Sequence, residues 1–213
     1  MKTLAQVPPL HGLPLALLGI FLLLSACGRT PPAAYYHLSA VDPGRQGSPM
    51  EAIGEAIGEA AIGEAAIGIG PVRLPDYLDR PQIVNLEGSN RLQLAEGHRW
   101  AEPLKVSIPR TIRENLATAL ATEKLFYFPW NQAVDYQIPV EIVRFEGVGY
   151  QVAHLEAIWS VQDPQGTAIL AQRRSEYRVP TGSSDSEGLV QALSQALGLF
   201  SREIAEQLKV RRE

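Results

Sequence analysis

The sequence contains almost no cysteine: Cys27 is the one thiol among 213 residues. A single cysteine forms no disulfide within the chain and makes no thiolate metal site by itself. The folded part must therefore be stabilised by burial of apolar side chains. A chain of this length, which corresponds to about one domain, can bury enough surface to do so.

The sequence also lacks an excess of positive charge and a run long enough to cross a membrane. Its net charge is −4, without a basic stripe, which makes nucleic acid a poor candidate partner. The apolar run 14–24 has eleven residues, whereas a transmembrane helix needs about 20. This length is typical of the hydrophobic core of a signal peptide.

Recognisable catalytic motifs are missing as well. The sequence has no metalloprotease helix motif, no nucleophile elbow and no glycine-rich phosphate loop. His37, His98 and His154 are scattered, without the spacing of metal ligands. His154 and Glu156 share the polar face of an expected strand, where we predict a solvated pair. We therefore predict no catalytic residue, no metal site and no cofactor.

The apolar run leads into Leu24-Ser25-Ala26-Cys27, which resembles the lipobox of bacterial lipoproteins. In that motif the chain is cut before the cysteine, which then carries a diacylglyceryl group and an N-acyl group. We predict a signal peptide at 1–26, lipidation of Cys27 and a tether at 27–34; an ordinary secretory signal or a buried helix is the alternative. Two or more acyl chains give stable membrane anchoring.

Residue 28 bears on the membrane to which such a lipoprotein is sorted. An aspartate directly after the lipidated cysteine commonly retains lipoproteins in the inner membrane of Gram-negative bacteria, and this chain has Gly28 there. We therefore expect the periplasmic face of the outer membrane.

A short-period repeat interrupts the chain at 51–68, where Glu-Ala-Ile-Gly occurs twice and is followed by two copies of Glu-Ala-Ala-Ile-Gly. Each glycine costs a helix about 1 kcal/mol relative to alanine. We predict a low-complexity insertion at about 45–67, either mobile or a frayed helix. The alternative, an ion site made by its glutamates, lacks the spacing of a calcium loop.

The remainder, 35–210, predicts a single α+β domain with a largely antiparallel or mixed sheet and two main helices. The first helix, at about 103–122, has apolar residues every four positions; Pro109 either kinks it or marks its regular start, with Ser107 as cap. The second, at 185–208, begins with a capping box of Ser184 and Glu187. Strands are expected near 35–38, 69–75, 82–86, 91–94, 136–145, 151–161 and 168–179, with a bulge after Ile142.

Several segments of this domain, in this order, resemble the PqiC family of ABC-type transport auxiliary lipoproteins. They are Tyr35-Tyr36, Ile69-Gly70-Pro71-Val72, Pro75, the run 77–84 and the run 99–104, within a similarity that covers about 35–208. The resemblance implies a non-enzymatic adaptor that works with an MCE-domain (mammalian cell entry) protein and docks a lipid-transport system to the outer membrane. A homo-oligomer is left open.

Two other functions compete with this one. A lipid-carrying module would need an apolar cavity of at least about 300 Å³. An envelope hydrolase would need a pocket that holds a nucleophile and a base within reach of each other.

The turn at 75–81 is the candidate partner-binding site. Tyr77 and Arg80 are residue types enriched at binding hot spots, with Asp79 between them. The flanking prolines have fixed φ angles, which lowers the entropy lost on docking. The alternative is structural: Leu78 and a local Asp79–Arg80 ion pair close the end of the sheet.

Overall fold

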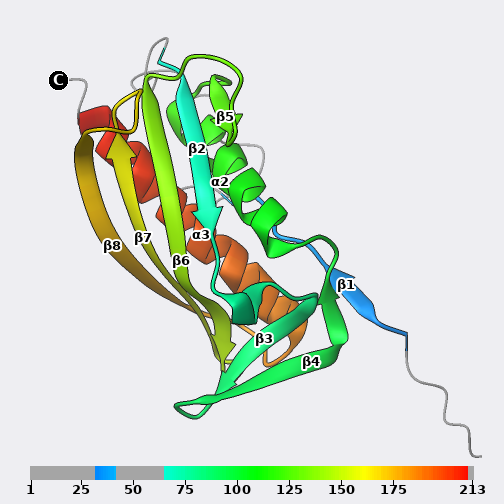
Figure 1. Ribbon diagram of the computed structural model, residues 1–213. Helices are drawn as coiled ribbons and strands as arrows, with labels where there is room; N and C mark the ends of the chain where they lie inside the picture. The colour runs from blue at the N-terminus through cyan, green and yellow to red at the C-terminus, as the bar shows by residue number, and fades with distance from the viewer. Residues whose placement is uncertain (1–31, 42–64, 211–213) are drawn as a thin grey trace, which may run out of the picture. The chain divides into compact units, whose positions relative to one another are not determined.

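One mixed β-sheet of eight strands, with two helices packed on one of its faces, forms the fold in the computed structural model, which describes residues 32–41 and 65–210 (Figure 1). The α+β prediction is confirmed. The predicted signal peptide, Cys27 and most of the repeat lie outside the described residues, so the predictions about them remain predictions. No described helix combines the length and apolarity needed to span a bilayer.

Helix α2 lies between β4 and β5 in the chain, and α3 follows β8. Six of the strands pair in the order β1-β4-β3-β6-β2-β5. The long strands β7 and β8 extend the sheet from the other edge of β6 as an antiparallel pair. The bounds are β1 (Ala34–Tyr36), β2 (Ile67–Arg73), β3 (Gln82–Glu87), β4 (Arg91–Trp100), β5 (Leu125–Tyr127), β6 (Tyr136–Val148), β7 (Val152–Gln162) and β8 (Ile169–Pro180).

Strand β6 is shared by two different neighbours along one edge. Its first half pairs in parallel with β2, up to Arg73 opposite Glu141. Its last residues pair in parallel with β3, where Asn85 lies opposite Gly147. The residues of β6 between these two regions have no strand partner on this edge. The chain between β2 and β3 must therefore close the gap.

Helices α2 (Leu104–Leu120) and α3 (Ser186–Val210) cover one face of the sheet, and in Figure 1 they lie behind it. The predicted four-residue spacing of apolar side chains is confirmed, because all five members of the α2 stripe are at most 2% exposed: Leu104, Ile108, Ile112, Leu116 and Leu120. Trp100, expected to be a core anchor, is also buried. The missing side chain of Gly147 allows α3 to pack closely against β6, because an added Cβ would lie 2.7 Å from a Leu189 methyl.

The alternative in which Ser107 caps the first helix is wrong, and so is the predicted cap of the second helix. α2 begins at Leu104 directly after Pro103 and continues through Pro109, so Ser107 lies inside the helix, where it is buried. α3 is capped by Asp185 rather than Ser184: the Asp185 carboxylate accepts a hydrogen bond of 2.8 Å from the Gly188 N–H. An aspartate one residue further along satisfies the same free amide groups of the first turn.

Two strand assignments also need correction. The predicted insertion was extended to residue 67, but Ile67 is fully buried and begins β2, so the end of the repeat is part of the core. The short strand β5, which pairs in parallel with Ile67–Ile69, was not predicted. Its residues follow α2 without a turn signal strong enough to mark a separate element.

The residues after β1 are held against both helices. Leu38 is fully buried. The Ser39 N–H donates to Oγ of Ser194 in α3 at 3.2 Å, and the Val41 N–H donates to Oδ1 of Asn115 in α2 at 2.8 Å. The start of the domain is thus fixed to its helical layer.

Candidate functional site

The turn 75–81 has a regular local structure. Residues Asp76–Leu78 form one turn of 3₁₀ helix after Pro75, whose carbonyl accepts a hydrogen bond of 3.0 Å from the Leu78 N–H. Leu78 is 1% exposed and anchors the turn in the core. Proline at the start suits this conformation, because its fixed φ and missing N–H cost nothing there.

The predicted local ion pair between Asp79 and Arg80 does not form. The Asp79 carboxylate instead lies 3.5 Å from Nζ of Lys105 in the first turn of α2, and both side chains are largely exposed. The Nε of Arg80 is buried and has no hydrogen-bond partner among the described residues. Asp79 therefore links the turn to the helical layer, whereas Arg80 is not tied to its neighbour.

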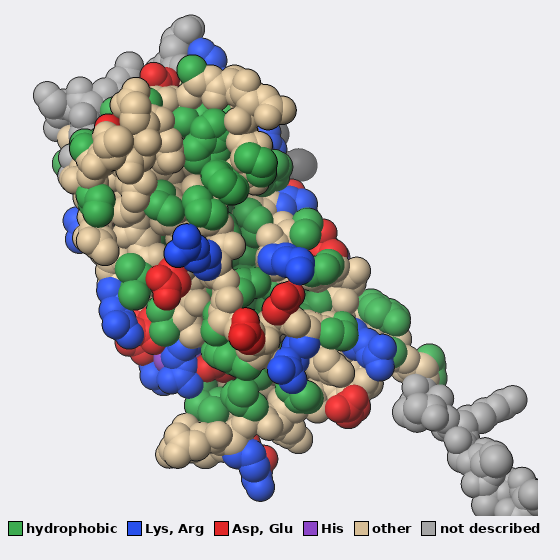
Figure 2. Space-filling view, in the orientation of Figure 1, with side chains coloured by type: hydrophobic (Ala, Val, Ile, Leu, Met, Phe, Trp, Pro, Cys, Tyr) green, Lys and Arg blue, Asp and Glu red, His purple; other side chains and the backbone are tan. Residues whose placement is uncertain are grey.

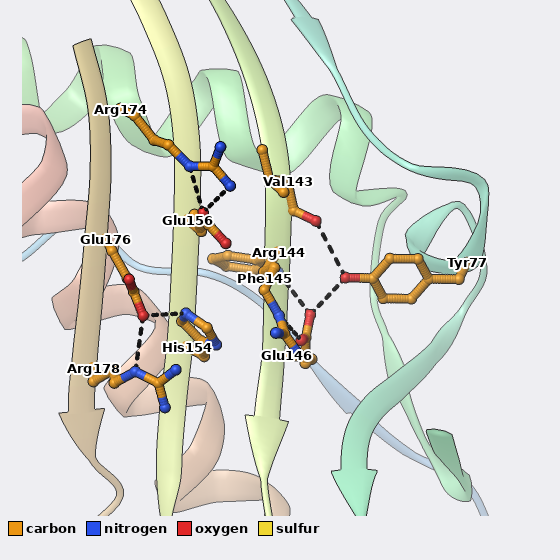
Figure 3. A network of polar contacts seen from close by, with 10 residues as sticks. All are labelled: Tyr77, Val143, Arg144, Phe145, Glu146, His154, Glu156, Arg174, Glu176 and Arg178. Carbon is orange, nitrogen blue, oxygen red and sulfur yellow. Dashed lines mark hydrogen bonds and ion pairs between the residues drawn. The ribbon is translucent and has the colours of Figure 1, made fainter. Parts of the chain in front are cut away.

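Tyr77 closes the gap between β2 and β3. Its hydroxyl donates a hydrogen bond of 2.7 Å to Oε2 of Glu146 and also lies 3.5 Å from the Val143 carbonyl oxygen, both on the unpaired stretch of β6 (Figure 3). Burial, together with the hydrogen bond to the Glu146 carboxylate, raises the pKa of Tyr77 above its usual value. The hydroxyl therefore stays protonated and keeps donating at physiological pH.

Glu146 is almost completely buried, and a β-bulge places it there. The register between β6 and β7 shifts between Ile142 and Arg144, as predicted from the switch in apolar parity. Phe145 then points into the core, while Arg144 and Glu146 lie on the sheet face that the helices leave open. Oε1 of Glu146 accepts from Nε of Arg144 at 2.8 Å, and Oε2 accepts from the Phe145 N–H at 3.0 Å.

These contacts compensate a buried negative charge. A carboxylate removed from water loses several kcal/mol of hydration unless charged and hydrogen-bonding groups replace it. Glu146 has three such partners: the guanidinium of Arg144, the hydroxyl of Tyr77 and one backbone amide. Removal of any one of them leaves a buried charge with less compensation.

His154 is the second buried polar group on this face, so the prediction of a solvated pair with Glu156 is wrong. It lies opposite Glu146 on β6 and opposite Arg178 on β8. Its Nε2 is 3.0 Å from Oε1 of Glu176, but neither ring nitrogen has a well-directed hydrogen bond among the described residues. Burial, and then the positive charges of Arg178 and Arg144, lower the pKa of His154, so the ring is neutral at neutral pH.

Ion pairs extend this network across β7 and β8. Nε of Arg174 lies 2.7 Å from Oε1 of Glu156, and Nε of Arg178 lies 2.9 Å from Oε1 of Glu176. Figure 2 shows charged side chains gathered on the lower half of this sheet face and hydrophobic side chains on its upper half. Arg178 and Glu176 are both about half exposed, so their pair contributes at most about 1 kcal/mol, whereas Glu156 is largely buried beside an exposed Arg174. The buried Tyr77–Glu146–Arg144 part is the stronger element.

The network has the chemistry of a structural brace. Its groups are carboxylates paired with guanidinium groups, a protonated tyrosine and a neutral histidine, without a serine or cysteine nucleophile among the residues that Figure 3 labels. In the described part of the chain, no group of three or more His, Cys, Asp and Glu side chains is arranged to hold a metal ion. What this face can offer a partner is a rigid surface with fixed charges.

Sequence reasoning identified the turn but missed its main contact. Glu146 is 69 positions away from Tyr77, and no local pattern links the two. One signal was available: Glu146 follows Phe145 inside a strand at the point where apolar parity changes. A carboxylate at a bulge in a buried strand is removed from water, so it requires a hydrogen-bond donor from elsewhere in the chain.

Replacement of Tyr77 by phenylalanine should therefore destabilise the fold. The variant keeps the ring but removes one donor from a buried carboxylate, a loss of about 1–3 kcal/mol that urea unfolding will measure. The control is Tyr35→Phe, because the Tyr35 side chain is 65% exposed. If Tyr77→Phe is no less stable than that control, the hydroxyl does not brace the sheet.

The neutral state of His154 predicts a pH dependence. Its pKa is lower in the folded than in the unfolded chain. The unfolded state therefore binds more protons as the pH falls below about 6.5, and stability present above that pH is lost. Unfolding between about pH 7.5 and 5.5 should show a shallower loss for His154→Gln than for wild type, and an unchanged loss for the exposed His37→Gln. Equal pH dependence of His154→Gln and wild type would contradict the assignment.

Known proteins resemble this chain at two levels. The family model for the ABC-type transport auxiliary lipoprotein component matches residues 50–205. Among solved structures, protein XCC0632 from Xanthomonas campestris has a TM-score of 0.67 and 16% identity, over 84% of this chain and 95% of that one. The crystal structure of an uncharacterized protein has a TM-score of 0.65 and 18% identity, over 83% of this chain and 99% of that one.

The two structures are too distant in sequence to show more than the fold. No curated protein matches the sequence. The family model, in contrast, spans well over half of the chain, from just before the repeat to near the end of α3. The protein belongs to the family of ABC-type transport auxiliary lipoproteins.

Proposed function

We propose that the protein is a PqiC-like accessory subunit, anchored to the periplasmic face of the outer membrane through Cys27, that docks an MCE-domain protein of an envelope lipid-transport system. The observation that carries the proposal is the family match over 50–205, which describes a lipoprotein component of an ABC-type transporter. The motifs from Tyr35 to Leu104 support the narrower assignment to PqiC.

The anchor is proposed from the sequence before the domain. Leu24-Ser25-Ala26-Cys27 supplies the lipidation motif, and Gly28 lacks the aspartate that favours inner-membrane retention. Strand β1 begins at Ala34, so the tether reaches at most about 25 Å at ~3.3–3.6 Å per residue. An anchored domain would therefore work close to the membrane surface, held by diacylglyceryl and N-acyl groups on Cys27.

Docking through the turn 75–81 fits the geometry of Tyr77, Asp79 and Arg80. The Tyr77 hydroxyl is hydrogen-bonded to Glu146, and this contact holds the turn in place. Asp79 is exposed, and Arg80 has no ion pair with it. A turn held rigid before binding loses less conformational entropy on docking, which favours affinity. We therefore assign partner contact to Asp79 and Arg80, with Tyr77 as their support.

The non-enzymatic role is supported by the family's description as a transport auxiliary component. More than one groove in the described part of the chain exceeds the volume of about 300 Å³ that a lipid-carrying role needs. The one of about 590 Å³ between residues 35–41 and α3 has the more polar lining, whereas the one of about 390 Å³ between α2, β2 and β5 is mostly apolar. Both are partly open to solvent, whereas small-molecule sites bury about 70–90% of their ligand. Docking remains the better-supported function.

Replacement of Cys27 by serine tests the anchor. Without the thiol there is no diacylglyceryl transfer and no cut before residue 27, so mature protein should disappear from the outer-membrane pellet. Cell fractionation with immunoblotting will show this. Mature-sized Cys27→Ser protein that stays in the outer-membrane pellet, also in cells lacking the transporter genes, would contradict the proposal.

The double variant Asp79→Ala, Arg80→Ala tests the docking turn. It should recover less MCE-domain partner in co-purification, by about tenfold or more if the pair is a hot spot, while the thermal midpoint stays near wild type. The matched control is Glu87→Ala, Arg91→Ala, which removes an exposed ion pair of 2.6 Å at the far end of the β3–β4 hairpin. Normal folding with undiminished recovery would exclude the turn as the contact.

A further inference from the structure

A groove lies beside the docking turn, on the other side of the Asp79–Lys105 ion pair. Its floor is formed by Ile69 and Val72 of β2, and one wall by Val106 and Pro109 of α2. The opposite wall is formed by β5 and the residues that follow it. Lys105 lines the groove and also pairs with Asp79 of the turn, so the two surfaces are continuous.

Large apolar side chains are exposed around this groove. Val106 is 49% exposed, Tyr127 43% and Phe128 55%. Elsewhere in the described residues, the exposed large apolar side chains do not line it: Tyr35, Leu92, Ile169 and Val210. Single exposed apolar residues are ordinary, but a cluster that lines a concavity is typical of a binding surface.

The aromatic wall is held in place by the strands beneath it. Trp130 lies against β2 at Gly68, where an added Cβ would come within 2.7 Å of the indole ring. Phe128 packs against Trp130 in a T-shaped arrangement with ring centroids 5.5 Å apart. The guanidinium of Arg113 lies 5.9 Å from the centre of the Tyr127 ring. A wall of this kind is in position before a ligand arrives.

The rim of the groove carries a backbone carbonyl and two basic side chains. Pro109 has no N–H, so the Lys105 carbonyl lacks its usual donor within α2. The Lys105 ammonium is 59% exposed, and its 3.5 Å contact with Asp79 is weak enough to be exchanged for another carboxylate. Arg110, in contrast, is held by both Glu102 and Glu114. Among the described residues that line the groove, Lys105 is therefore the cation available to a ligand.

We propose that this groove receives a large apolar side chain, with a carboxylate nearby in the same segment, from a polypeptide of the transporter, a proposal that rests on the docking function above. The groove is partly open to solvent, so a bound acyl chain would remain partly in water. A protein partner supplies its own surface to cover the opening, and an apolar anchor in such a pocket is typical of binding hot spots. Continuity with the turn through Lys105 favours the same partner for both.

In-cell photo-crosslinking with the full-length lipoprotein identifies the occupant. A photo-reactive amino acid is placed at Val106, and at Ile169 as a control that is 60% exposed on β8. The expected result is a Val106 adduct with a polypeptide of the transporter, absent from the Ile169 sample. An adduct with a second copy of this chain, with its own residues 42–64 or with phospholipid would overturn the proposal, and so would no adduct.

Binding of the purified MCE-type domain separates the groove from the general function. Val106→Glu should weaken its binding to the mature lipoprotein in nanodiscs by about tenfold or more, whereas Ile169→Glu should change it by less than about twofold. If wild type and Val106→Glu bind equally well, the groove is wrong and the docking function stands. If wild type does not bind the MCE-type domain, the proposed partner is wrong, and the Val106 adduct alone decides whether another transporter polypeptide occupies the groove.

Discussion

The stability of the sheet depends on one edge of β6, where a stretch between the regions paired with β2 and β3 must find other contacts. β2 pairs with the first half of this strand and β3 with its end, so the residues between have no ladder partner there. Tyr77 closes that gap by donating to the buried carboxylate of Glu146, which Arg144 also neutralises. This contact holds together segments 69 positions apart, and it fixes the course of the chain from β2 to β3.

The same constraint gives the proposed docking surface its rigidity. Because Tyr77 and Leu78 are both committed to the interior, the backbone of the turn is fixed while Asp79 remains exposed. Asp79 in turn reaches Lys105 at the rim of the apolar groove. The turn and the groove thus form one surface with an apolar part and a charged part. A short tether after a lipidated Cys27 would present that surface near the membrane.

Elements set by periodicity were predictable from the sequence. The α2 stripe, the β7–β8 hairpin and the bulge in β6 all have local patterns, and all are present. The α3 cap was displaced by one residue because Ser184 and Asp185 are both good caps. Ile67 was assigned to the repeat because composition alone does not show where a repeat joins a strand. The parity change at Phe145 marks Glu146 as an unusual position, but its pairing with Tyr77, the burial of His154 and the groove depend on tertiary packing between segments far apart in the sequence.

Hydrogen exchange on the mature lipoprotein, with and without the MCE-type domain, tests most directly the claim that the turn and the groove form one docking surface. The account predicts slower exchange on complex formation at 76–80, in the first turn of α2 and at 125–130, with the β7–β8 hairpin unchanged. Protection confined to β7 and β8, or no protection at all in a mixture where the complex has formed, would contradict it.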